Sequence, residues 1–279
     1  MYHSLMVIAQ SSSVAFLIRP DGRVAYDLAG SGPLVVLVPG MGELRSSYRF
    51  VAPALRAAGY RVACTDLRGH GDSDATFASY GDTDTASDIT ALIETLGAPA
   101  IIAGNSMAAG SAVLVAAQRP ELVLGLVLVG PYVRDARTSS IKRLMFRVAM
   151  ARPWIAVSWK ALMPRLYAGR QPEDFDDYRH QVIASLHQAG RAKAFSLTTR
   201  TSHAAAEASL PNVSKSTLVI MGEQDPDFSD PKGEAAWIAA TLHGEAVMIS
   251  GAGHYPQSQQ PEVTTSALIA FANRVTAHA

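Results

Sequence analysis

A serine at position 106 sits in a segment whose residue types can build a reactive nucleophile. Residues 101–110 read Ile-Ile-Ala-Gly-Asn-Ser-Met-Ala-Ala-Gly, an apolar run followed by a turn and a small-residue helix start. A strand that turns at once into a helix strains the backbone at the serine and presents its hydroxyl beside the first helical N–H groups. Gly104 stands two residues before Ser106, but Ala108 replaces the second glycine of the usual G-x-S-x-G pattern. Because Gly-Asn-Ser is also an ordinary turn sequence, this segment alone leaves a purely structural turn open.

An aspartate and a histidine follow this serine in the order that completes a catalytic triad. Asp225 comes just after the apolar run 216–221, and His254 comes just after the run 245–250. Loops at the carboxyl ends of parallel strands meet at one edge of a sheet, so we expect the three loops to converge. In that arrangement His254 removes the proton of Ser106, and Asp225 orients the imidazole.

The loop that carries the acid holds two further carboxylates. Asp227 and Asp230 lie within five residues of Asp225. We choose Asp225 because it falls where the apolar run ends. The other two aspartates remain alternatives on sequence grounds.

Two glycine-rich motifs precede the serine. Residues 38–42 read Val-Pro-Gly-Met-Gly, and residues 66–73 read Asp-Leu-Arg-Gly-His-Gly-Asp-Ser. With the triad candidates, they resemble the oxyanion loop and the D-x-R-G-x-G-x-S turn of the α/β-hydrolase fold family, in the group of small esterases, lactonases, C–C hydrolases and cofactor-free haloperoxidases. The resemblance covers nearly the whole chain, although Pro39 replaces a histidine often found there. It implies that the backbone N–H groups of Met41 and Met107 form the oxyanion hole.

The remaining pattern predicts an α/β fold with a mostly parallel central sheet flanked by helices. Apolar runs alternate with helical segments, as expected for a sheet covered on both faces. The expected elements are a hairpin over 14–28, strands over 34–38, 61–66, 100–105 and 123–129, and a helix over 85–96.

A helical insertion interrupts this alternation. We expect residues 1–130 and 216–279 to form the core and residues 131–215 to form a helical cap, because apolar residues recur there at helical spacing. A cap lies over the pocket, so its apolar side is expected to supply substrate contacts. The candidate pocket residues are Met145, Trp154, Trp159 and Met163.

The first half of the cap is strongly basic. Residues 131–170 contain nine lysines and arginines and one acid, Asp135. Such a bias could serve an anionic substrate, a membrane surface or an acidic partner. Lys142, Arg143 and Arg147 fall opposite the apolar face, which favours a solvated helix face.

Composition excludes several other classes. The net charge of zero gives no support for nucleic-acid binding. A single cysteine, Cys64, excludes an intrachain disulfide and fits a buried strand position. His70 and its acidic neighbours lack a metal-ligand pattern, and no cofactor is expected. No run reaches a membrane span, and residues 1–9 lack a basic n-region, which predicts a cytoplasmic protein; the sequence does not indicate an oligomeric state.

Three functions stay open. Hydrolysis of a carboxylic ester or lactone with an apolar acyl group through an acyl-enzyme is the first. C–C bond hydrolysis or cofactor-free haloperoxidase or perhydrolase chemistry at the same triad is the second. A ligand-binding, receptor-like protein with slow turnover is the third. An aspartate nucleophile is disfavoured because position 106 is serine.

Overall fold

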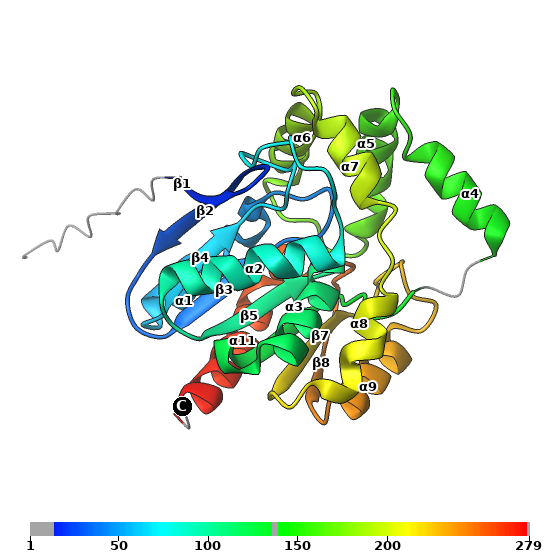
Figure 1. Ribbon diagram of the computed structural model, residues 1–279. Coiled ribbons are helices and arrows are strands. Elements are labelled where there is room, and N and C mark those ends of the chain that lie inside the picture. The colour runs from blue at the N-terminus through cyan, green and yellow to red at the C-terminus, as the bar shows by residue number, and fades with distance from the viewer. Residues whose placement is uncertain (1–13, 136–138, 278–279) are drawn as a thin grey trace, which may run out of the picture.

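A computed structural model describes residues 14–135 and 139–277 (Figure 1). The N-terminal stretch 1–9 considered above lies outside the described residues. Eight strands form one sheet in the order β1-β2-β4-β3-β5-β6-β7-β8, in which β2 pairs antiparallel with both β1 and β4 and all other neighbouring pairs are parallel. The strands are β1 (Ala15–Arg19), β2 (Gly22–Ala29), β3 (Leu34–Val38), β4 (Arg61–Thr65), β5 (Ala100–Asn105), β6 (Val123–Val129), β7 (Thr217–Gly222) and β8 (Glu245–Ile249). The expected mostly parallel sheet is confirmed.

Helices cover both faces of the sheet. One buried cluster joins the sheet to α2, α3 and α9, and another joins the opposite face to α1 and α11. Every residue of β3 and β5 is buried, as expected for central parallel strands made of continuous apolar runs. The core helices are α1 (Val51–Ala57), α2 (Asp82–Leu96), α3 (Met107–Gln118), α9 (Pro231–Thr241), α10 (Pro256–Gln259) and α11 (Pro261–Thr276).

Five helices lie between β6 and β7: α4 (Ser140–Ala149), α5 (Ile155–Leu166), α6 (Phe175–Leu186), α7 (Arg191–Thr198) and α8 (Ala204–Ser209). Helices α5, α6 and α7 gather at the top of Figure 1 around a third buried cluster. This cluster includes Tyr255 and contacts Met41 and Leu44, so it packs on the loops that follow β3 and β8. Helix α8 instead returns to the core against α3. Short 3₁₀ turns complete the chain at η1 (Arg45–Tyr48), η2 (Pro120–Leu122) and η3 (Leu210–Asn212).

Helix α4 stands apart from this packing, at the right edge of Figure 1. None of its residues is buried, and Ile141, Leu144, Met145 and Val148 are each more than half exposed. Its apolar spacing therefore predicts the helix correctly but not a buried face. In the described part of the chain, no helix is long and apolar enough to cross a membrane.

Candidate active site

Ser106 occupies a strained turn between β5 and α3. Its backbone angles are φ 57° and ψ −123°, a left-handed conformation that costs about 1–3 kcal/mol for a residue with a side chain. The turn requires a close backbone approach at Gly104, where an added Cβ would lie 2.4 Å from the carbonyl oxygen of Ala108. Met107 is the first residue of α3, so its N–H has no carbonyl partner within the helix. The serine hydroxyl therefore stands at a helix N-terminus, where developing negative charge is stabilised.

His254 and Asp225 meet at the same edge of the sheet. Oδ2 of Asp225 lies 2.7 Å from Nδ1 of His254, and both residues are about 2% exposed. Gly130, with φ 50°, makes room for this pair, because an added Cβ there would lie 3.2 Å from Nδ1 of His254. The structure thus brings Asp225, the expected acid, onto the imidazole.

The backbone of His254 is fixed by both the core and the insertion. Its N–H donates to the carbonyl of Leu166 at the end of α5, at 2.8 Å. Its carbonyl accepts from the side-chain amide of Asn105, the residue before Ser106, at 3.2 Å. The histidine loop is therefore hydrogen-bonded directly to the serine turn and to α5. Among the described residues, no hydrogen bond joins the hydroxyl of Ser106 to Nε2 of His254, a contact that often forms only with substrate bound.

Asp227 lies on the other side of the imidazole. Its Oδ2 atom is 3.7 Å from Nε2 of His254. Burial opposes the charged imidazolium, but Asp225 and Asp227 outweigh it and raise the pKa of His254 to about 9. Partial burial raises the pKa of Asp227 and the nearby carboxylate of Asp225 adds to this, whereas the imidazole of His254 opposes it. Sequence reasoning placed Asp227 only as a substitute for Asp225, whereas the structure has both carboxylates facing one histidine.

The loop after β3 runs against the serine turn. A Cβ added to Gly40 would lie 2.9 Å from Cβ of Ser106, so only glycine permits this approach. The N–H of Gly42 donates to Nε2 of His70 at 3.0 Å, and Nδ1 of His70 faces the carbonyl of Arg68 at 2.8 Å. Burial lowers the pKa of His70 to about 4, so this ring stays neutral and accepts from the loop. His70 thus holds the loop that carries the N–H of Met41, the other expected oxyanion donor.

The glycine-rich motif at residues 66–73 holds the chain just after the same loop. Asp66 accepts from the backbone N–H of Arg45 at 2.7 Å and also pairs with its guanidinium. Gly71 has φ 50°, and an added Cβ would lie within 2.2 Å of the Asp66 carboxylate. This motif is therefore a structural support for the oxyanion loop.

Glu43 is a buried carboxyl group that sequence reasoning missed. It follows the oxyanion loop and is fully buried. Its Oε2 atom accepts hydrogen bonds from the hydroxyls of Tyr178 at 2.7 Å and Tyr167 at 3.2 Å, both from the insertion. Burial raises the pKa of Glu43 to about 7, although the two tyrosine hydrogen bonds oppose that rise. A glutamate in a glycine-rich loop gives no sequence signal of burial, because the burial comes from residues of the insertion that are distant in the sequence.

The expected pocket residues divide into two groups. Trp159 and Met163 are 3% and 0% exposed within the cluster that packs on Met41. Nε1 of Trp159 donates to the carbonyl of Gly42 at 3.0 Å, which places this side chain on the oxyanion loop.

Met145 and Trp154 do not join them. They are 66% and 47% exposed, and Met145 lies on the helix that stands apart. The structure therefore gives neither side chain a place in an enclosed pocket. The physical reason is that helical spacing identifies an apolar face without identifying what covers it.

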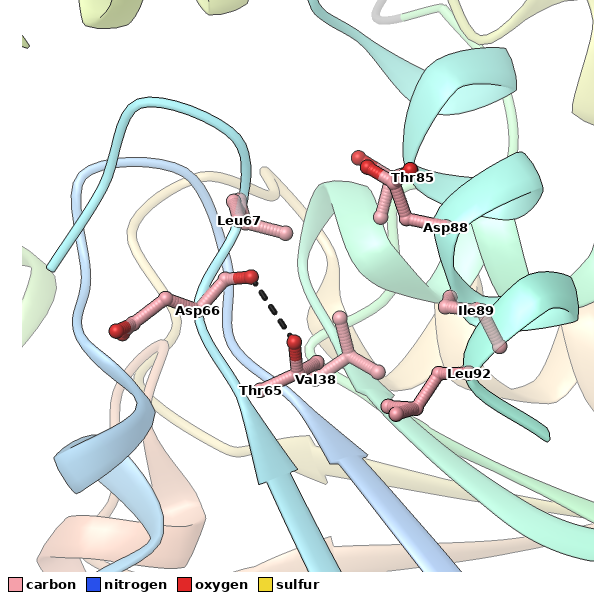
Figure 2. A pocket seen from close by; sticks show the side chains of 8 residues that line it. All are labelled: Val38, Thr65, Asp66, Leu67, Thr85, Asp88, Ile89 and Leu92. Carbon is pink, nitrogen blue, oxygen red and sulfur yellow. Dashed lines mark hydrogen bonds between the residues drawn. The ribbon is translucent and has the colours of Figure 1, made fainter. Parts of the chain in front are cut away.

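A small internal cavity has none of Ser106, Asp225 and His254 in its lining. Figure 2 shows it between β3, the end of β4 and α2. Its volume is about 10 Å³. This space holds no more than about one water molecule, so it is not a substrate site. Its lining residues are Val38, Thr65, Asp66, Leu67, Thr85, Asp88, Ile89 and Leu92.

Asp225, Asp227 and His254 also bring three possible metal-ligand atoms within 4.8 Å of one another. A metal needs a deprotonated histidine. The two carboxylates here instead favour the protonated ring, and Oδ2 of Asp225 is already engaged with Nδ1 of His254. The arrangement therefore suits proton transfer better than metal binding.

Comparison with known proteins gives one family match and several relatives. A model described as the alpha/beta hydrolase family matches residues 35–267. A 2-(acetamidomethylene)succinate hydrolase of Mesorhizobium japonicum is 28% identical, over 90% of this chain and 92% of that protein. A bromoperoxidase structure from Bacillus anthracis has a TM-score of 0.81 at 20% identity, covering 94% of this chain and 100% of that one. An esterase from Exiguobacterium antarcticum has a TM-score of 0.80 at 21% identity, covering 92% and 98%. At these identities the two solved structures are evidence for the fold alone.

Proposed function

Because the chain belongs to the alpha/beta hydrolase family, we propose that it is a serine hydrolase in which Ser106, His254 and Asp225 act as one catalytic unit. The observation that carries this proposal is the buried hydrogen bond between His254 and Asp225 beside a strained serine turn. In this mechanism Nε2 of His254 takes the hydroxyl proton of Ser106 while Oγ attacks a carbonyl carbon. Asp225 holds the imidazole in the required tautomer and stabilises its cationic form.

The oxyanion that forms in this step is bound by the backbone N–H groups of Met41 and Met107. The placement of Gly40 against Ser106 and of Met107 at the first turn of α3 supports this assignment. Losing one such donor costs about 3 kcal/mol of transition-state stabilisation in enzymes of this kind. Collapse of the intermediate expels the leaving group with the proton from His254, and water then hydrolyses the acyl-enzyme.

The preferred substrate is a carboxylic ester or lactone with an uncharged, apolar acyl group. Two observations support this choice. Apolar and aromatic side chains of the insertion, including Trp159 and Met163, pack on the oxyanion loop. Three arginines near these loops, Arg45, Arg49 and Arg134, are each paired with a carboxylate, which reduces their attraction for an anionic substrate.

An N-acetyl enamide carried by a dicarboxylate is a second candidate. It is favoured by the relative whose substrate is 2-(acetamidomethylene)succinate, because that similarity spans about nine-tenths of both chains. C–C bond hydrolysis and haloperoxidase chemistry use the same catalytic groups and remain further alternatives. A slow receptor-like protein would also become acylated but would not turn over.

A fluorophosphonate probe tests the nucleophile directly. It should label the wild-type protein and not Ser106→Ala, whereas equal labelling of both would remove Ser106 from the mechanism. A panel of p-nitrophenyl esters, lactones and 2-(acetamidomethylene)succinate then identifies the substrate class. The panel is repeated with EDTA, and again with peroxide and bromide. EDTA-insensitive ester turnover supports the proposal; activity confined to peroxide favours haloperoxidase chemistry, and acylation without turnover favours the receptor.

A further inference from the structure

Asp227 lies beside His254, but a triad of Ser106, His254 and Asp225 gives this second carboxylate no role. The two carboxylates around His254 occupy different sides of the ring: Asp225 is at Nδ1, at 2.7 Å, and Asp227 is at Nε2, at 3.7 Å. Nε2 is the nitrogen that exchanges protons with the nucleophile, the leaving group and water. A separation of 3.7 Å is too long for a direct hydrogen bond, and a water molecule can donate to both atoms across such a gap.

Solvent reaches the catalytic groups at Asp227. Ser106 and His254 are 5% and 2% exposed, whereas the side chain of Asp227 is 30% exposed. The next residue, Phe228, begins the wall of a surface hollow. The other residues that line this hollow are Arg134, Ser229, Asp230, Gly233 and Glu234. Among Ser106, His254 and Asp227, the carboxylate of Asp227 is therefore the group most open to water.

Hydrogen bonds also fix the position of the Asp227 carboxylate relative to Ser106, His254 and Asp225. The N–H of Asp227 donates to Oδ1 of Asp225 at 3.0 Å, so the two acids keep a fixed spacing. The hydroxyl of Tyr132 interacts with Asp227, and the N–H of Tyr132 donates to the carbonyl of Ser106 at 3.2 Å. The Tyr132 ring lies edge-on to His254, with ring centroids 6.1 Å apart. Asp227 is therefore positioned relative to the nucleophile, the base and the acid at once.

We propose that Asp227 is a positioning residue for deacylation, which holds the hydrolytic water against Nε2 of His254. The proposal rests on the serine mechanism above. The water oxygen forms a bond to the acyl carbon, one of its protons passes to Nε2, and the carbonyl π pair moves to the oxygen in the oxyanion hole. The second proton of the water remains hydrogen-bonded to Asp227. Collapse of the intermediate breaks the bond to Oγ of Ser106, which takes the proton back from Nε2, so Asp227 ends the cycle unchanged.

Charge alone is the competing account of Asp227, because several groups set the titration of His254. Those that interact with the ring are Asp225, Asp227, Glu43, Tyr132 and Tyr255. If Asp227 acted only by stabilising the imidazolium, its removal would shift the pH dependence and leave the rate at high pH unchanged. If it positions water, the defect persists on the pH plateau where His254 is already neutral. Acylation, which uses no water, is spared in the second case.

Carbamoylation separates the two half-reactions whichever step limits ester turnover. A p-nitrophenyl carbamate transfers its carbamoyl group to the serine, and release of that group requires water. For Asp227→Asn we expect carbamoylation within about threefold of wild type and decarbamoylation slowed about 10-fold on the pH plateau, because the amide oxygen makes only a neutral hydrogen bond to the water in place of a charge-assisted one. Intact mass should show the carbamoyl-enzyme persisting.

Asp230→Asn is the matched control, because Asp230 lies in the same loop but caps α9 through the N–H of Gly233. It should leave both steps unchanged. Equal slowing of both steps in Asp227→Asn, or decarbamoylation at the wild-type plateau rate, would overturn the positioning role. Failure of the wild type itself to be carbamoylated would instead overturn the serine mechanism, so the two failures are distinguishable.

Discussion

Asp225 and His254 form a fully enclosed acid–imidazole pair, with Oδ2 of Asp225 2.7 Å from Nδ1 of His254 and the two side chains 0% and 2% exposed. The Oδ1 atom of the same aspartate accepts the backbone N–H of Asp227. Each oxygen of Asp225 therefore has a partner, so its orientation is fixed.

Asp225→Asn tests this pair. The side-chain amide of Asn can donate its N–H to Nδ1 of His254, which favours the tautomer that carries its proton on Nε2. In that tautomer Nε2 can no longer accept the proton of Ser106. We expect kcat to fall about 10⁴-fold, with KM much less affected. Stopped-flow assays of p-nitrophenyl ester hydrolysis provide the measurement.

Asp230→Asn again serves as the control for the Asp225 substitution, and its kcat should match that of wild type. If Asp230→Asn were inactive and Asp225→Asn active, the triad acid would be Asp230.

The pH dependence of activity follows from the carboxylates around His254. The general base must be neutral, and the pKa of this histidine is raised to about 9 by Asp225 and Asp227. We therefore expect kcat/KM of wild type to rise with pH and to reach its plateau above an apparent pKa near 9. Removing one negative charge in Asp227→Asn should move this rise to lower pH. A wild-type rise centred at the ordinary histidine value would contradict the role given to the flanking charges.

The fold and the main site motifs were accessible from sequence because they depend on local chemistry. The central strands are continuous apolar runs, so their bounds follow from composition alone, and β3 and β5 match the predicted residues. The serine turn and the glycine-rich loops are specified by residues at fixed spacing, such as Gly104 before Ser106. These features need no knowledge of distant contacts.

Three other features depend on tertiary contacts that the pattern does not contain. Asp227 and Asp225 are two residues apart, and only the loop conformation puts them on opposite nitrogens of one ring. Glu43 is buried by tyrosines more than 120 residues later in the chain. The apolar spacing of α4 indicates a helix but not a partner, and its apolar face, including Met145, is exposed.

Two tryptophans of the insertion provide a matched pair for testing whether the insertion contributes to the substrate site. Each donates its indole N–H to a backbone carbonyl: Trp159 to Gly42 in the oxyanion loop at 3.0 Å, and Trp154 to Val148 at 2.8 Å. Trp159→Phe leaves the carbonyl of Gly42 unpaired in a buried site, which costs about 1–3 kcal/mol of stability. We expect kcat/KM to fall as well and the preference among acyl chain lengths to change.

Trp154→Phe should leave both properties nearly unchanged, because that side chain is half exposed. Thermal unfolding and kcat/KM for p-nitrophenyl esters of increasing chain length measure the two effects. If Trp159→Phe and wild type had the same preference among acyl chain lengths, Trp159 would not contact the acyl group.

Glu43 makes a separate prediction about stability. Its pKa is raised to about 7 in the folded protein, mainly by burial, from an ordinary value of 4.5. The folded state therefore binds the proton more tightly than the unfolded state. The stabilisation that this gives is complete below the ordinary value and is lost as pH rises through about 7. Above that pH the folded protein carries a buried carboxylate.

Glu43→Gln removes this titration while keeping an acceptor for the hydroxyl of Tyr178. Relative to wild type, the variant should gain stability between about pH 4.5 and pH 7 and then reach a plateau of about 3 kcal/mol, or a rise in Tm of about 5 °C. Thermal unfolding of both proteins across this pH range measures the difference. Below about pH 7 Glu43 is neutral in the folded protein, as Gln is, so His254 contributes equally to both proteins there; above that pH the ionised Glu43 raises the pKa of His254 and Gln does not. A difference that did not change with pH would mean that Glu43 keeps the same charge in the folded and unfolded states.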